Sequence, residues 1–331
     1  MRELSLSQAV NEAIAEEMRR DPKVILMGED VAEAGTPFKV LSGLVEEFGT
    51  ERVIDTPISE PGFAGIAVGA AMTGLRPIVD LMFGDFLFLV MDQICNQAAK
   101  THYMSGGKLK VPMVLRTNLG ATRRSAAQHS QSLHALVAHI PGLKVAMPSS
   151  AYEAKGLLKS AVRDNNPVVI FEDKLMYQDK ANVPADDYII PLGSANTLSE
   201  GSDITFVATS SMVQVASEAA AMLLSDGFSA EVIDPRTIVP FDEQTILDSV
   251  KRTSRAIVID EGHKSFGVTA EIASIISEKA FYHLDAPVQR MGAMDVPIPF
   301  SPALEDLTVP NANAVYVNAK SLITGNLPYV S

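Results

Sequence analysis

The amino-acid sequence predicts an α/β protein with two domains, each built on a parallel sheet. Strand-like and helix-like segments alternate along most of the chain, which is typical of βαβ units. The apolar runs at 24–27, 168–171 and 257–259 lack the alternation of a half-exposed strand, as expected for parallel strands covered on both faces. The length of 331 residues suits about two domains.

The first half of the chain opens with apolar residues at helical spacing and then alternates between strands and helices. Pro61 suits the first position of a helix, and Ser150 followed by Glu153 forms a capping-box sequence. We expect strands at 24–27, 77–81, 112–115, 143–147 and 167–171, and helices at 7–19, 61–74, 86–100 and 150–163.

The second half repeats this alternation after a segment that has no helical period. Residues 178–197 contain Pro184 and Pro191, and we interpret them as a connector between a domain at 1–177 and a domain at 198–331. We expect strands at 204–208, 230–233, 256–260 and 287–290, and helices at 213–224, 243–249 and 268–281.

Composition and charge argue against several classes of protein. The 27 basic and 40 acidic residues give a formal charge of −13, which argues against binding to duplex nucleic acid. The longest apolar stretches, 63–75 and 81–91, are shorter than the roughly 20 residues of a membrane-spanning helix. The start of the chain carries acidic residues and is unlike a targeting peptide. Cys95 is the only cysteine, which favours a reducing compartment. We expect a cytoplasmic protein with no nucleic-acid or membrane partner.

Familiar ligand motifs are missing from the sequence. It contains no glycine-rich dinucleotide or phosphate loop, no nucleophile elbow and no paired-cysteine or His-Glu-x-x-His metal signature. Ligands of open α/β sheets bind beyond the carboxyl ends of the strands. The residues that directly follow the expected strands are therefore the candidates for a functional site.

Glu60 lies in the segment 55–62, at the start of a helix rich in small residues. Small residues allow another backbone or a flat ligand to approach closely. A carboxylate at a helix start also interacts favourably with the positive end of the helix dipole. Glu60 is therefore either a helix cap or a functional carboxylate, and spacing alone leaves both interpretations open.

His129 lies in the segment 127–134, after the loop 120–127. A histidine beyond a strand end can transfer protons near neutral pH, although an ordinary surface or packed histidine has the same pattern. We expect Glu60 and His129 to lie at one edge of the first sheet.

Three further features are less specific: two of them have both a structural and a functional interpretation, and the third has a structural one only. Phe86 belongs to an aromatic cluster at 83–88 that either packs in the core or offers a face to a heteroaromatic ring. The segment 163–167 is typical of a turn, but its Asp and Asn oxygens could also hold a hard cation. Cys95 has neither a neighbouring base nor a second thiol, so we interpret it as a core residue.

Taken together, these segments resemble the β subunits of thiamine-diphosphate-dependent 2-oxo acid and acetoin dehydrogenases. The matching segments span the whole chain in one register: 56–60, 62–65, 103–107, 128–131, 141–144, 154–158, 233–237, 260–262 and 299–305. The resemblance implies a pyrimidine-binding first domain and a second domain like the transketolase C-terminal domain.

The resemblance also implies roles for individual residues. Glu60 corresponds to the carboxylate that hydrogen-bonds the aminopyrimidine ring of thiamine diphosphate and favours its imino tautomer. His129 corresponds to the histidine that assists the reaction with the lipoyl group. Phe86 corresponds to the aromatic residue against the pyrimidine, Ile58 to an apolar cofactor contact, and Glu29 to a second polar neighbour.

A potassium-binding structural site is implied at the end of one helix and the start of two strands. The corresponding residues are Met113, Ala161, Val162, Asp164 and Asn166.

The resemblance gives the missing phosphate motif a meaning. Enzymes of this class hold the diphosphate and magnesium with a Gly-Asp-Gly…Asn motif, and this sequence contains no Gly-Asp-Gly. The resemblance implies that a separate α subunit carries this motif and holds the magnesium. It further implies a second β subunit, a heterotetramer of two α and two β chains, and docking on a lipoyl acyltransferase core.

Within the family, three segments look most like acetoin dehydrogenase β subunits: 128–134, 171–174 and 234–237. Pyruvate and branched-chain 2-oxo acid dehydrogenase β subunits are the alternatives, and a non-catalytic assembly module is a remote one. Arg123 and Arg124 replace smaller residues that are common in this loop of the family.

Overall fold

The fold is built on two large sheets whose strands are mostly parallel. The predicted α/β class is therefore confirmed. The computed structural model describes residues 2–325. One compact unit comprises the residues up to 119 together with 136–192 and 238–240, and the other comprises 120–135, 193–237 and the residues from 241 onward. The change near residue 192 falls inside the expected connector.

The sheet of the first unit has seven strands in the order β12-β6-β7-β5-β4-β2-β3. Every neighbouring pair from β6 to β3 is parallel, so the carboxyl ends of these strands share one edge. The strands are β2 (Val24–Gly28), β3 (Val53–Asp55), β4 (Arg76–Phe83), β5 (Val114–Leu119), β6 (Lys144–Ala146), β7 (Val168–Asp173) and β12 (Thr237–Val239). The pattern did not indicate β3 or β12.

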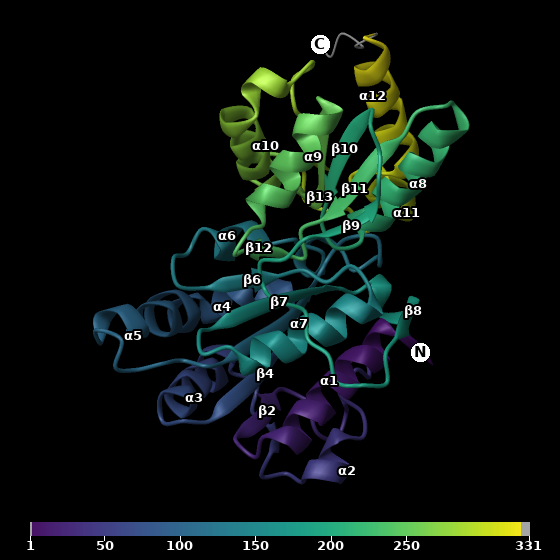
Figure 1. The fold of residues 1–331 in the computed structure, drawn as a ribbon. Helices are drawn as coiled ribbons and strands as arrows, with labels where there is room; N and C mark the ends of the chain where they lie inside the picture. Colours follow the sequence, from purple (N-terminus) through teal and green to yellow (C-terminus); the bar gives the residue numbers. More distant parts are fainter. Residues whose placement is uncertain (1, 326–331) are drawn as a thin grey trace. The chain divides into compact units, whose positions relative to one another are not determined.

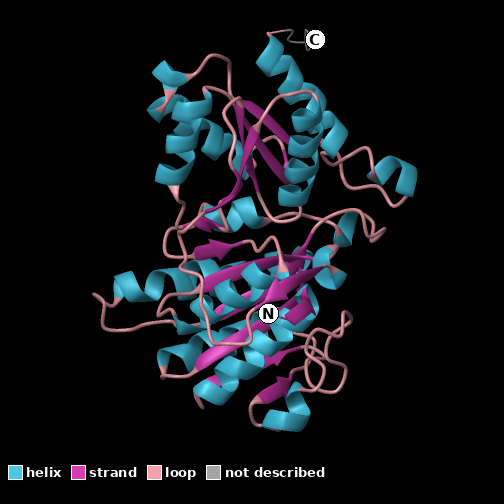
Figure 2. Ribbon diagram, turned by 45° about the vertical axis from the view of Figure 1, so that its right-hand side comes forward, coloured by secondary structure: helices cyan, strands magenta, loops and turns pink. Residues whose placement is uncertain are grey.

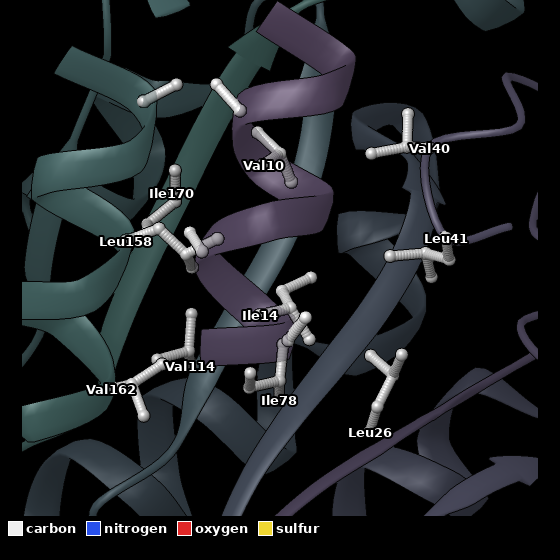
Figure 3. Close-up of a cluster of buried hydrophobic side chains, with 14 of the residues drawn as sticks. Val10, Ile14, Leu26, Val40, Leu41, Ile78, Val114, Leu158, Val162 and Ile170 are labelled. Atoms are coloured by element: carbon white, nitrogen blue, oxygen red, sulfur yellow. The ribbon is translucent and has the colours of Figure 1, made fainter. Parts of the chain in front are cut away.

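Helices cover both faces of this sheet (Figures 1 and 2). On one face, α1 (Leu6–Arg20) packs beside α7 (Ala151–Arg163) over the central strands, and Figure 3 shows this core. Its members include Val10, Ile14, Leu26, Ile78, Val114, Leu158, Val162 and Ile170. Helix α3 (Glu60–Met72) contacts β2 and β4 but contributes nothing to that core, which places it on the opposite face.

Ion pairs also join α1 and α7. Lys155 and Lys159 have no exposed surface. The Nζ of Lys155 donates to Glu12 and, at 2.7 Å, to Glu16, and the Nζ of Lys159 donates to Glu16. A buried ammonium group is tolerated only when it is paired, so these contacts fix the register of the two helices.

Caps and a local irregularity define the helix ends. The side chain of Ser150 accepts a hydrogen bond from the Glu153 N–H at 3.3 Å, which confirms the predicted cap of α7. A complete capping box between Ser5 and Gln8 starts α1. The helix expected at 86–100 consists of several pieces with a π-helical segment in the middle: η1 (Gly84–Phe86), α4 (Leu87–Met91), η2 (Asp92–Ala98) and α5 (Ala99–Met104).

The sheet of the second unit has five strands in the order β14-β13-β10-β11-β9. They are β9 (Asn196–Ser199), β10 (Ile204–Ala208), β11 (Ala230–Asp234), β13 (Ala256–His263) and β14 (Gln289–Ala293). The expectation of a purely parallel sheet is wrong at one edge, because β9 pairs antiparallel with β11. Strand β9 begins inside the expected connector and forms the edge of the sheet next to β11.

Helices again cover both faces of the second sheet. Helices α8 (Met212–Ser225) and α12 (Ala312–Thr324) share one apolar core with β10 and β11. Helices α9 (Glu243–Thr253) and α10 (Val268–Lys279) share another. The remaining elements are short: β1 (Arg2–Ser5), α2 (Leu44–Phe48), η3 (Ala127–His129), α6 (His134–Ala138), η4 (Met176–Gln178), β8 (Lys180–Val183), η5 (Phe281–His283) and α11 (Pro302–Glu305).

Residues 2–325 contain neither a membrane-spanning helix nor a cluster of metal-binding side chains. No helix in this range has both the length and the apolar character needed to cross a bilayer. The same range holds no cluster of three or more His, Cys, Asp or Glu side chains arranged to bind a metal ion.

Candidate active site

Four candidate residues lie just beyond the carboxyl ends of three adjacent strands in the first unit. Glu29 follows β2, Ile58 follows β3 and Phe86 follows β4, while Glu60 begins α3. Strands β4, β2 and β3 are neighbours in the sheet. The fold therefore brings together residues that are up to 57 positions apart in sequence, at the edge where parallel sheets bind ligands.

The position of Glu29 depends on close packing at the end of β2. A Cβ on Gly28 would lie 2.5 Å from the carbonyl oxygen of Asp80, so only glycine fits there. Asp55, at the end of β3, accepts a hydrogen bond from the Ala32 N–H at 2.7 Å. The chain that follows Glu29 is thereby tied to the neighbouring strand.

The position of Phe86 depends on an irregularity in β4. The register between β4 and β5 shifts between Asp80 and Phe83, and the following turn approaches β5 so closely that a Cβ on Gly84 would lie 2.4 Å from the Asn118 carbonyl oxygen. Bulges next to functional sites commonly redirect a side chain. The half-buried ring of Phe86 meets the ring of Phe83 edge-on, with 6.1 Å between the centroids.

Glu60 is buried at the first turn of α3, with 8% of its surface exposed. Within residues 2–325, its carboxylate takes part in no hydrogen bond or ion pair. Its place in the first turn still favours the helix dipole. A helix-start carboxylate that forms no cap bond, however, keeps its oxygens available to a ligand.

The two acidic residues of this site interact. Burial, the adjacent Asp30 and the charge of Glu60 together raise the pKa of Glu29 above its ordinary value. Two like charges held near one another disfavour ionisation, and perturbed carboxylates of this kind gather at functional sites.

The side chains at this edge of the sheet combine a carboxylate with an aromatic and an aliphatic group. Glu60 is buried and its carboxylate has no hydrogen-bond or ion-pair partner within residues 2–325, and Phe86 offers a half-buried ring. Ile58 is 75% exposed and offers an aliphatic contact. A polar group that a buried carboxylate can bond, together with apolar walls, is the usual composition of a cofactor pocket.

His129 belongs with the second unit, whereas Glu60 belongs with the first. The sequence assigned His129 to the edge of the first sheet because its segment follows β5. In the structure, the segment 120–135 groups with the second unit and is hydrogen-bonded to Glu305 and Asp260 of that unit. His129 is half-buried and ends the short helix η3, where its N–H donates to the Ala126 carbonyl at 3.3 Å.

The residues of the implied potassium site lie around the end of α7. The carbonyls of Val162 and Asp164 accept hydrogen bonds from Arg76 at 2.9 and 2.8 Å. The carbonyl of Met113 accepts one from the Val168 N–H at 3.0 Å. A carbonyl oxygen has a second lone pair, so these bonds leave the oxygens able to bind a cation.

The carboxylate of Asp164 is held by its neighbours. It accepts hydrogen bonds from Lys144 at 2.5 Å and from the N–H and side chain of Asn166 at 2.8 and 2.9 Å. Burial alone raises the pKa of Asp164, but these bonds outweigh burial and lower it. The carboxylate is therefore ionised at neutral pH, and Lys144 compensates its charge.

Sequence reasoning missed a charge network beneath the candidate site. Arg116 on β5 donates to both oxygens of Glu172, at 3.0 and 2.5 Å, and to Asp80. All three side chains are at most 3% exposed. Burial alone lowers the pKa of Arg116, but the two carboxylates outweigh burial and hold this pKa well above its ordinary value. The sequence feature that could have indicated this network is a single charged residue within each of several apolar strands.

Cys95 is buried in η2, which confirms its interpretation as a core residue. Burial raises the pKa of its thiol. A buried thiol of this kind is a poor nucleophile, so Cys95 is not part of the candidate site.

Comparison with known proteins agrees with this arrangement. Residues 2–180 match the transketolase pyrimidine-binding domain, and residues 193–315 match the transketolase C-terminal domain. Among solved structures, a split-gene transketolase described as an inactive β4 tetramer has a TM-score of 0.80 at 23% identity and covers 97% of this chain and 98% of its own. A Pichia stipitis transketolase mutant has a TM-score of 0.70 at 15% identity, covering 97% of this chain and 46% of its own. These two likenesses concern the fold alone.

Curated relatives are similar over nearly their whole length. The acetoin:2,6-dichlorophenolindophenol oxidoreductase subunit beta of Bacillus subtilis is 49% identical, covering 95% of both chains. The pyruvate dehydrogenase E1 component subunit beta of Rickettsia felis is 48% identical, covering 97% of this chain and 98% of its own. The acetoin subunit of Cupriavidus necator is 44% identical, covering 98% of both. This chain, which carries the transketolase pyrimidine-binding and C-terminal domains, therefore belongs to the family of acetoin and pyruvate dehydrogenase β subunits.

Proposed function

We propose that this chain is the β subunit of a thiamine-diphosphate-dependent dehydrogenase component that cleaves acetoin or decarboxylates a 2-oxo acid and passes the acyl group to a lipoyl acyltransferase. The observation that carries the proposal is the buried residue Glu60, beside Glu29 at the ligand-binding edge of a pyrimidine-binding domain. Among the described residues, 2–325, its carboxylate has no hydrogen-bond or ion-pair partner. The names of relatives at 49% and 48% identity support the reaction class.

Thiamine diphosphate would supply a thiazolium carbon that becomes a nucleophile after losing its proton. In this chain, Glu60 would hold a proton at a ring nitrogen of the pyrimidine, because a carboxylate makes a strong charge-assisted hydrogen bond. Phe86 would pack against the ring, Ile58 would contact its apolar part, and Glu29 would be a second polar neighbour. Protein groups of this kind tune the cofactor, whose own chemistry does the rest.

His129 would act later, in the transfer to the lipoyl group. An imidazole can donate or accept a proton near neutral pH, and transfer of an acyl group to a dithiolane needs a proton at the sulfur that leaves. The half-buried position of His129 at the end of η3 leaves it accessible to such a substrate.

The rest of the active site would come from an α subunit. The sequence has no Gly-Asp-Gly motif, so we assign the diphosphate and magnesium to an α chain that carries Gly-Asp-Gly…Asn. The assembly would be a heterotetramer of two α and two β subunits docked on a lipoyl acyltransferase core. We further propose that the carbonyls of Met113, Ala161, Val162, Asp164 and Asn166 bind a potassium ion that stabilises the first unit.

Acetoin is the substrate that the segments 128–134, 171–174 and 234–237 favour, with pyruvate and branched-chain 2-oxo acids as alternatives. Two of these segments have structural duties, since Glu172 pairs with Arg116 in the core and the buried carboxylate of Asp234 accepts from the Arg236 N–H at 2.7 Å. The segment 128–134 also has a structural contact, through His134 and Asp260, so the three segments together carry the preference.

The test is reconstitution with an α chain that carries the Gly-Asp-Gly…Asn motif, thiamine diphosphate and magnesium. We expect no turnover by this chain alone and turnover of acetoin by the pair, measured with a dye and with a lipoylated acceptor. Turnover of pyruvate or branched-chain acids instead would reassign the substrate. If the assembled pair turned over none of these compounds, the proposal would fail and the non-catalytic assembly module would become the better interpretation.

A further inference from the structure

The segment 120–135 carries His129 and is held by acidic side chains of the second unit. It follows β5 in sequence, yet its bonds run to residues near positions 260 and 305. Glu261 accepts a hydrogen bond from the Ala121 N–H at the start of the segment. Two further attachments follow, one on each side of His129 in the sequence.

The backbone before His129 is strained. Thr122, Arg124 and Ala126 have φ angles of 68°, 58° and 60°, in the left-handed region that residues with a side chain rarely adopt. Three such residues within five positions are costly and persist only where the surroundings fix them. Strain of this kind is concentrated at functional sites.

Glu305 fixes two of these three strained residues. Its side chain is fully buried. One oxygen accepts from the Thr122 N–H at 2.7 Å, and the other accepts from the Arg124 N–H at 3.2 Å and from the Arg124 guanidinium at 2.6 Å. The guanidinium also donates to Asp306 at 2.8 and 3.2 Å. One buried carboxylate thus binds the backbone and the side chain of the same loop.

The other attachment is His134, which lies as far after His129 as Arg124 lies before it. The Nε2 of His134 is 3.0 Å from the carboxylate of Asp260, and both side chains are 1% exposed. Asp260 also accepts from the Thr209 hydroxyl and from the Gly262 N–H. In the sequence, His129 therefore lies midway between two residues, Arg124 and His134, that are held by buried carboxylates.

We propose that Glu305 and Arg124 are positioning residues that set the location of the His129 imidazole. This inference rests on the proposed role of His129 in acyl transfer. The hydrogen bonds of the Glu305 carboxylate offset the cost of the strained conformation of Thr122 and Arg124. The guanidinium of Arg124 binds both Glu305 and Asp306, which a small residue at this position could not do. Without the clamp, the segment relaxes and His129 leaves the position from which it reaches the lipoyl sulfur.

The test compares Arg124→Ala and Glu305→Gln with Arg123→Ala, a matched control at the exposed neighbouring arginine, in the assembled α/β enzyme. Two rates are measured: acyl transfer to a lipoylated acceptor and reduction of 2,6-dichlorophenolindophenol, which needs no lipoyl sulfur. We expect Arg124→Ala to lower lipoyl transfer by about tenfold or more and dye reduction by less than about twofold. Arg124→Lys should recover part of the loss, because lysine keeps the charge but not the fork.

A double-mutant cycle separates positioning from general destabilisation. If Arg124 acts through His129, Arg124→Ala should have no further effect on lipoyl transfer in a His129→Ala background. Unchanged lipoyl transfer in Arg124→Ala would overturn the inference. Equal losses in both rates that add to the His129→Ala loss would overturn it too, because they indicate a structural role.

Amide hydrogen exchange gives a readout that does not depend on activity. Exchange at residues 122–126 should become faster in Arg124→Ala than in Arg123→Ala, and unchanged exchange would contradict the clamp. If Glu305→Gln does not fold, the two Arg124 variants still decide the question. If the wild-type pair lacks turnover, the proposed function fails, while the exchange experiment still tests the clamp.

Discussion

Glu29 and Glu60 form a pair of interacting carboxylates beyond the ends of β2 and β3, where burial, Asp30 and the charge of Glu60 together raise the pKa of Glu29. The protein therefore keeps two acidic groups near one another, and no cationic side chain within residues 2–325 pairs with Glu60. Such an arrangement lowers stability and is retained where function needs it.

Replacing Glu29 by Gln should stabilise the isolated chain at neutral pH. A raised pKa in the folded state means that ionised Glu29 opposes folding, so the penalty is present above the folded pKa and disappears as the pH falls below the unfolded value. We expect the melting temperature of Glu29→Gln to exceed that of the wild type at pH 7 and to approach it near about pH 4. The control is Glu33→Gln, at an exposed acidic residue of the same loop, which should change little. An unchanged melting temperature at pH 7 would contradict the coupling.

The network around Arg116 should make a large contribution to stability. Arg116→Met leaves Asp80 and Glu172 buried without a compensating charge, and breaking a buried pair in this way costs about 3–5 kcal/mol. Urea denaturation measures the loss. Lys180→Ala, which removes an exposed ion pair with Glu3, should cost less than about 1 kcal/mol. Equal losses for the two variants would show that the network is not a main support of the first unit.

Potassium should stabilise the first unit specifically. The carbonyls of Val162 and Asp164 accept from Arg76, and the ionised Asp164 carboxylate pairs with Lys144. A potassium ion at this turn would use the second lone pairs of these oxygens. We expect a higher melting temperature in potassium chloride than in sodium or choline chloride at equal ionic strength, because a ligand that binds only the folded state stabilises it. The difference should be lost in Asp164→Ala. Identical melting temperatures in all three salts would refute the potassium site.

The formal charge of −13 leads to a prediction about docking. If the chain binds a basic surface of an acyltransferase core, the association rate should fall as salt rises, because long-range attraction is screened. Stopped-flow or surface-binding kinetics at several salt concentrations measure this rate. A rate that does not depend on salt would exclude electrostatic steering.

The sequence was sufficient for most elements but not for pairings over long distances. Strong periodicity and buried apolar runs predicted α1, α7 and the central strands within a few residues. Strands β1 and β8 stabilise one another across about 180 positions, and neither has a pattern of its own. The π-helical segment η2 keeps the apolar spacing of an ordinary helix, so the pattern could not reveal it.

The sequence likewise indicated only part of the candidate site. Glu29, Ile58, Glu60 and Phe86 could be named because they follow strands that share one sheet edge. The attachment of the His129 segment to the second unit depends on Asp260 and Glu305, which lie far away in sequence. Arg124 was visible only as a departure from smaller residues, and its partner becomes apparent only in three dimensions.

The most direct test of the central claim is the turnover number of Glu60→Gln in the assembled α/β enzyme, measured together with its melting temperature. Gln is similar in size to Glu, but it has no carboxylate that could share a proton with a ring nitrogen. General acid–base contributions of this kind amount to about 100-fold or more in rate. We expect kcat to fall by about 100-fold or more while the melting temperature stays within a few degrees of the wild type. A variant that kept wild-type kcat would contradict the proposed role of Glu60 and, with it, the assignment of this site to thiamine diphosphate.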